Sequence, residues 1–184
     1  GASGIIGTTA AAKAEPDGYT ILMGYVSTLA IHPSMYTKLS YDPQKDFVPI
    51  AHVCDTSLVM VVPPSLGVNS LQEFVALAKS KPGQVSYASV GNGSGAHLSA
   101  ELLKMMTGIA ITQVPYKGSG PALTDLMGGH VQVMFDALPS SIPLVASGKL
   151  NATVGGPSVM PPVPKNLGAG PAWQVAKDVN DHNR

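Results

Sequence analysis

Arginine is nearly absent from this sequence of 184 residues: ten of its eleven basic residues are lysines, and the single arginine is Arg184. No arginine inside the chain can therefore clamp a carboxylate or phosphate through two parallel hydrogen bonds. Charged residues of both signs make up only 12% of the sequence, and the formal net charge is zero. The neutral net charge predicts no nucleic-acid partner and no general attraction to a membrane surface. Because no arginine lies inside the chain, an anionic ligand must be held by other groups.

Cysteine is represented only by Cys54, which excludes a disulfide within the chain and a metal site built from several cysteines. We expect its side chain to be buried as a small apolar group. No uninterrupted apolar run reaches about 18 residues, so no membrane-spanning helix is predicted. The histidines at positions 32, 52, 130 and 182 lack metal-like spacing, so no zinc site or other cofactor is predicted.

Apolar residues make up 45% of the sequence, enough for a substantial core, and their pattern alternates between strands and helices. Ser70 and Glu73 form a capping-box pattern that predicts a helix to about Ser80. Further helices are predicted from residue 95 to Gly108 and over 119–127, with strands at 58–62, 84–90, 109–114 and 131–135. This alternation predicts an α/β fold with a mainly parallel sheet.

Further expectations concern the flanking segments and the apolar face of the helix that begins near residue 95. Residues 5–14 are predicted to form a helix, and 19–25 and 50–53 to form strands, the first of them covered on both faces. In the helix that begins near residue 95, Leu98, Leu102 and Met105 or Met106 recur at helical spacing and are expected to form its apolar stripe. Beyond Leu150, Pro and Gly residues crowd a stretch typical of loops.

The loops at the carboxyl ends of the predicted strands are the expected binding region, because ligands of open α/β sheets bind there. The most informative is 89–97, SVGNGSGAH, whose glycines permit close backbone approach and whose helix presents free N–H groups. Such a loop binds an anionic oxygen without arginine. The same glycines also match a loose dinucleotide fingerprint, but no acidic residue follows about 20 residues on, and they are also compatible with a tight βα turn alone.

The individual candidates each have two readings. His97 at the third helical position either contacts a ligand or only makes hydrogen bonds that support the local structure. Tyr116 and the Gly118 backbone precede a second helix N-terminus, where either could contact a ligand. Asp136 either accepts a hydrogen bond from a ligand or orients the loop at Ser119. Ser27 and Thr28 offer hydroxyls to a ligand or to a local turn. No nucleophile is paired with an oriented base, so binding is favoured over catalysis.

These residues also carry a family resemblance, dense and in order over residues 1–150. The sequence resembles the receptors of tripartite tricarboxylate transporters, the Bug-type solute-binding proteins, at the following stretches: GASGIIG at 1–7, PDGYT at 16–20, YDP at 41–43, DFVPI at 46–50, KPG at 81–83, YAS at 87–89, GNGS at 91–94, His97-Leu98 and VPYKG at 114–118.

The resemblance implies a periplasmic binding protein of type II, a Venus flytrap that closes over a small carboxylate ligand and delivers it to membrane subunits. The implied ligand is a di- or tricarboxylate, an acidic amino acid or an aromatic acid. The residues implied to contact it are Ser27 and Thr28 from the first domain and, from the second, Ser89, Gly91, Asn92, Gly93, Ser94, His97, Tyr116, Gly118 and, more weakly, Asp136.

The resemblance also implies how the chain divides. Residues 1–62 would form part of domain 1, 63–150 a complete domain 2, and 151–184 a shortened return to domain 1, with hinge strands near 61–62 and 150–154. We expect the sequence to begin inside a longer protein. The alternatives are a small α/β enzyme that uses the 91–97 loop as an anion or phosphate cradle, and a remnant that pairs with a second copy to cover its sheet.

Overall fold

The computed structural model describes residues 2–153 of the chain. These residues separate into two compact units, one formed mainly by residues 52–153 and the other by residues 3–51. Each unit is described by itself below. Across the described residues, no helix combines the length and apolar character needed to cross a lipid bilayer.

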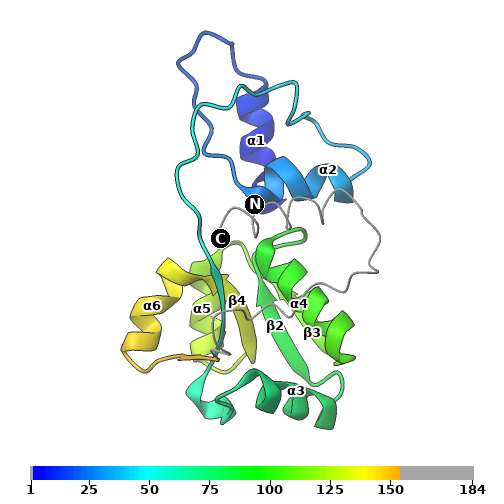
Figure 1. Cartoon of the computed structure of the whole chain (residues 1–184), viewed down its shortest axis with the longest axis vertical. Coiled ribbons are helices and arrows are strands. Elements are labelled where there is room, and N and C mark those ends of the chain that lie inside the picture. Colours follow the sequence, from blue (N-terminus) through cyan, green and yellow to red (C-terminus); the bar gives the residue numbers. More distant parts are fainter. Residues whose placement is uncertain (1, 154–184) are drawn as a thin grey trace, which may run out of the picture. The chain divides into compact units, whose positions relative to one another are not determined.

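The larger unit is built on one five-stranded sheet (Figure 1) with the order β3-β2-β4-β1-β5. β2 pairs in parallel with both β3 and β4, whereas β1 pairs antiparallel with β4 and β5. The expected α/β fold is confirmed, but the sheet is mixed rather than mainly parallel. The strands are β1 (Leu58–Val62), β2 (Val85–Ser89), β3 (Ile111–Pro115), β4 (Val133–Ala137) and β5 (Asn151–Ala152).

Helices cover both faces of this sheet, because neighbouring residues of each strand point to opposite sides. Met60, Tyr87 and Val133 belong to a core beneath α3 and α4, while their neighbours Ala88 and Met134 belong to a second core beneath α5 and α6. In Figure 1, α5 and α6 lie to the left of β2 and α4 to its right. The helices of this unit are η3 (Pro64–Leu66), α3 (Leu71–Ser80), α4 (Gly95–Thr107), α5 (Ser119–Met127) and α6 (Leu138–Ala146).

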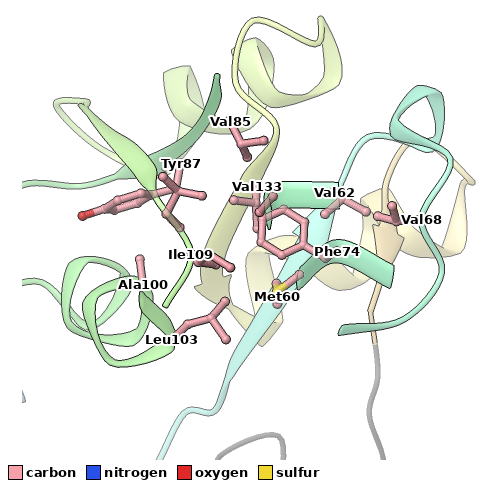
Figure 2. Packing of buried hydrophobic residues seen from close by; sticks show 12 residues of the cluster. Met60, Val62, Val68, Phe74, Val85, Tyr87, Ala100, Leu103, Ile109 and Val133 are labelled. Atoms are coloured by element: carbon pink, nitrogen blue, oxygen red, sulfur yellow. The ribbon is translucent and has the colours of Figure 1, made fainter. Parts of the chain in front are cut away.

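The first core is centred on Phe74 of α3, whose ring lies among Met60, Val62 and Val133 in Figure 2. The Phe74 side chain is fully buried. Tyr87 enters the same core from β2 and reaches outward to donate a 2.8 Å hydrogen bond to Glu101 on α4. The core therefore joins β2, the strand that leads into the expected binding loop, to both helices on this face.

Two expectations about the helices have mixed outcomes. The capping pattern before α3 is confirmed, since the Ser70 hydroxyl accepts the Glu73 N–H at 3.2 Å, although the Glu73 carboxylate accepts from the Asn69 N–H. The expected apolar stripe of α4 is wrong. The structure buries Ala96, Ala100 and Leu103, and it leaves Leu98 and Leu102 half-buried and Met105 exposed, because α4 approaches the sheet through its smaller residues.

The unit of residues 3–51 contains helices but no strand among its described residues: η1 (Ala2–Gly4, which begins just before it), α1 (Ile5–Ala12), the π-helical turn η2 (Ser27–Ile31) and α2 (His32–Met35). The expected strand at 19–25 is therefore wrong. Tyr19 is 91% exposed, and Ile21 and Met23 are also exposed. A strand exists only through hydrogen bonds to a neighbouring strand, and this unit supplies none in the part described.

The segment before β1 also departs from expectation. Residues 50–53 form no strand, and Ile50 and Val53 are exposed. Cys54 is exposed rather than buried, which corrects the expectation drawn from its apolar character. β1 and β5, which we expect to act as hinge strands, lie side by side with Val61 opposite Ala152. The hinge and the domain boundaries stay predictions.

We predict that Phe74→Ala lowers the free energy of unfolding by about 3 to 5 kcal/mol, because it leaves a cavity where β1, β4 and α3 meet. Urea denaturation followed by circular dichroism measures this loss. Met105→Ala is the matched control on an exposed site and should change stability by no more than about 0.5 kcal/mol. Equal effects of the two variants would contradict the assigned core.

Candidate functional site

The chain topology singles out one edge of the sheet. β2 and β4 are parallel neighbours, yet β2 leads into α4 on one face while β4 leads into α6 on the other. Such a reversal opens a crevice between the carboxyl ends of the two strands, where open α/β sheets bind their ligands. The loop that follows Ser89, the start of α6 directly after Ala137 and the loop after β3 all lie at this edge.

The loop from Ser89 to Ser94 turns sharply into α4. Gly91 and Gly93 adopt φ angles of 116° and 74°, which side-chain-bearing residues rarely reach. Ser94 caps the helix, and its hydroxyl accepts the N–H of His97 at 3.2 Å. The N–H groups of the first two helical residues, Gly95 and Ala96, have no acceptor within the helix. This end of α4 can therefore donate hydrogen bonds to an anionic oxygen.

Hydrogen bonds made by the side chains of Ser89 and Gln113 support the loop. Ser89 is fully buried, and its hydroxyl accepts hydrogen bonds from Gln113 Nε2 at 2.7 Å and the Gly91 N–H at 3.4 Å. The Gln113 amide also donates to Asn92 Oδ1 at 3.2 Å. Ser89 thus shapes the loop, while Asn92 lies exposed at its tip. Our sequence reasoning did not include Gln113, although a polar residue inside the strand ITQVP was a usable signal.

His97 holds the other end of the loop. Its Nδ1 accepts the Gly93 N–H at 3.3 Å, so the neutral ring carries its proton on Nε2. Burial lowers the pKa of His97, Glu101 opposes this shift and Lys104 adds to it. The imidazole is therefore neutral at pH 7, and the Gly93 N–H is engaged by it. This geometry corresponds to the structural reading of His97, in which the ring fixes the loop.

At the second helix N-terminus the side chains are also engaged. The Tyr116 hydroxyl donates to Asp125 Oδ2 at 2.8 Å, and desolvation together with this carboxylate raises the pKa of Tyr116 to about 12. The Tyr116 N–H donates to the Ser89 carbonyl at 2.8 Å, which joins this loop to the end of β2. Gly118 precedes α5 without a side-chain cap, and Lys117 is exposed. The Gly118 backbone and the exposed Lys117 side chain therefore stay accessible at this helix N-terminus.

Asp136 lies at the end of β4 and is only 2% exposed. Its carboxylate accepts hydrogen bonds from Ser119 at 2.9 Å, from Ser141 at 2.8 Å and from Ser140. The hydrogen bond from Ser119 corresponds to the structural alternative for Asp136, in which its carboxylate orients the loop at Ser119. No three His, Cys, Asp or Glu side chains within residues 2–153 are grouped so that they could hold a metal ion.

Leu58 is a further residue at this edge that sequence reasoning missed. Its side chain, at the start of β1, is 41% exposed and lies against Gly95. A Cβ atom at position 95 would stand 2.9 Å from Leu58 Cδ1, so only glycine fits there without displacing the leucine. The N-terminus of α4 therefore has an apolar wall on one side.

Ser27 and Thr28 are placed in the smaller unit, within the π-helical turn, and both are buried. The Thr28 hydroxyl donates to the Tyr25 carbonyl at 3.2 Å, and the Thr28 carbonyl accepts from the Tyr41 hydroxyl at 2.7 Å. The Tyr25 hydroxyl in turn donates to the Ser3 carbonyl. These bonds correspond to the local-turn reading of Thr28, and π-helical turns are frequent at functional sites.

The chain is similar to several known proteins. A family model described as the tripartite tricarboxylate transporter family receptor matches residues 1–156. The protein BugT of Bordetella pertussis is 43% identical over 153 residues, which are 83% of this chain and 47% of that protein. The chain thus spans about half the length of the curated relatives that it matches.

Solved structures show the same fold. A structure described as a periplasmic transporter is 41% identical with a TM-score of 0.81, and the match covers 96% of this chain and 58% of that one. Rpa4515 of R. palustris with adipate is 37% identical with a TM-score of 0.76, and the match covers 83% of this chain and 51% of that one.

We predict that His97 makes stability fall in mild acid. Because its folded-state pKa is lowered, its stabilising effect is complete above its unfolded-state pKa near 6.5 and is lost as the pH falls through the folded-state value. Denaturant midpoints measured from pH 7.5 to pH 5 should decline more steeply for the wild type than for His97→Gln. Parallel curves for the two proteins would contradict the buried neutral ring.

Proposed function

The chain belongs to the tripartite tricarboxylate transporter receptor family, and on that premise we propose that it is the carboxylate-holding part of a solute-binding receptor. Proteins of this family are periplasmic and bind solutes without chemically transforming them. Because the chain spans about half of its relatives' length, the activity, ligand and partners of the whole protein form part of the proposal. The proposed ligand is a small organic acid, delivered to the membrane subunits of a tripartite transporter.

The N-terminus of α4 with the Ser89–Ser94 loop is the observation that carries this proposal. The N–H groups of Gly95 and Ala96, which have no acceptor within the helix, and the positive end of the helix dipole suit a carboxylate. The supporting bonds from Gln113 and His97 hold the loop in place before a ligand arrives. Such preorganisation reduces the ordering cost of binding. We include Gly91, Asn92, Gly93 and Ser94 among the proposed contacts, with Ser89 and His97 as supports.

An enzyme that uses the same loop as a phosphate cradle is less well supported. The Ser94 hydroxyl caps the helix and His97 Nδ1 is occupied by Gly93, so this pair is not arranged as a nucleophile and its base. Tyr116 is likewise bonded to Asp125. We therefore expect capture and release of an unchanged ligand. Adipate, a carboxylate found with one relative, illustrates the class.

Thermal-shift measurements with a panel of organic acids test the proposal. At a concentration 100 times its Kd, a ligand that binds only the folded state stabilises it by about 2.7 kcal/mol, which raises the melting temperature. We expect at least one carboxylate to do so, whereas ATP and NAD should not. Stabilisation by a nucleotide and by no carboxylate would instead support the enzyme alternative.

A single charge placed on the loop should weaken the binding. Asn92→Asp keeps the acceptor oxygen for Gln113 and adds a negative charge at the exposed tip, so we predict a rise in carboxylate Kd of roughly tenfold or more. Isothermal titration calorimetry measures this change. Asn69→Asp makes the same substitution on an exposed residue before α3 and should leave the Kd unchanged. Equal Kd values for both variants would remove the loop from the site.

A further inference from the structure

Asp136 determines the direction of three hydrogen bonds. Each of the three serine hydroxyls around Asp136 donates its proton to the carboxylate, which accepts. Ser119 donates to Oδ1 at 2.9 Å, and Ser141 donates to Oδ2 at 2.8 Å. Ser140 divides its proton between Oδ2 and the Ala137 carbonyl, which it reaches at 2.8 Å. Among the described residues, Ser119 is the only donor to Oδ1.

Ser119 differs from Ser141 in exposure. Ser141 is fully buried, whereas Ser119 is only partly buried and is the first residue of α5. It follows the loop whose Tyr116 N–H binds the Ser89 carbonyl, and its hydroxyl reaches the end of β4. Ser119 therefore lies at the edge where the carboxyl ends of β2 and β4 meet.

The hydroxyl of Ser119 can consequently only accept a further hydrogen bond, because its single proton is committed to Asp136. The buried carboxylate of Asp136 behind it also lies at the N-terminus of α5, where the helix dipole is positive. An anionic oxygen is thus disfavoured at Ser119, while a hydroxyl or ammonium group is favoured. The N-terminus of α4 has the opposite preference, since Gly95 and Ala96 offer N–H donors there.

We propose that Ser119 is a specificity-determining residue that selects a carboxylate ligand bearing a hydroxyl or ammonium group, and that Asp136 is the positioning residue that imposes this preference. The inference rests on the proposed function. In this arrangement the ligand carboxylate lies at α4 and its donor group lies at Ser119. Asp136 acts through the serine and does not touch the ligand.

Two series of matched acids test this inference on the full chain. Succinate, malate and aspartate carry hydrogen, hydroxyl and ammonium at the same carbon, and glutarate, 2-hydroxyglutarate and glutamate repeat the comparison one carbon longer. Calorimetry should show that the hydroxy or amino acid of at least one series binds at least tenfold more tightly than its unsubstituted parent. In Ser119→Ala the members of that series should bind within about threefold of one another, through weaker binding of the substituted acids alone.

Variants separate this role from a structural one. Asp136→Asn should also abolish the preference, since the amide can donate to the Ser119 hydroxyl and free the hydroxyl proton for other acceptors. Ser119→Thr keeps a hydroxyl at this position and, unlike Ser119→Ala, should retain the preference. Ser140→Ala removes another hydroxyl from the same carboxylate and should leave the preference intact. Melting temperatures verify that each variant is folded. An unchanged preference in Ser119→Ala, or none in the wild type, overturns the inference, and binding of no carboxylate overturns the proposed function with it.

Discussion

The parallel pairing of β2 with β3 on one side and β4 on the other is the constraint on which the candidate site depends. It aligns Ser89 with Pro115 and places the end of β4 at the same edge. Because α4 and α6 leave this edge on opposite faces of the sheet, it is the kind of edge at which open α/β sheets bind ligands. The core around Phe74 and Tyr87 stabilises this arrangement by holding β2 beneath α3 and α4.

At this edge some polar groups make hydrogen bonds within the protein, and others are left to bond a ligand. The buried Ser89 and the half-buried Gln113 and His97 make hydrogen bonds that support the loop. The donors that remain belong to the backbone at the start of α4, which can bind a carboxylate without arginine. The near absence of arginine from the sequence is therefore compatible with the proposed binding of a carboxylate by backbone N–H groups.

The two helix N-termini at this edge are not equivalent. α4 is capped by an uncharged serine and keeps its positive end unneutralised. α5 begins beside the buried carboxylate of Asp136, which orients Ser119 and offsets the local dipole. The proposed site, with one donating and one accepting side, would distinguish ligands by the position of their polar groups.

Local sequence determined much of the fold. The serine cap before α3, the glycine that ends α4 at residue 108, and the bounds of α5 all follow from short-range hydrogen bonding and backbone preference, and the structure confirms them. The loop 89–97 was recognisable as an anion-binding candidate for the same reason.

Tertiary structure decided what local patterns leave open. Residues 19–25 have the composition of a strand but no strand partner among residues 2–153. α4 buries Ala96, Ala100 and Leu103 rather than Leu98 and Leu102, and β1 runs antiparallel to β4. The hydrogen bonds of Asp136, Gln113 and Leu58's contact with Gly95 join residues distant in sequence, so only the pairing of the strands could bring them together.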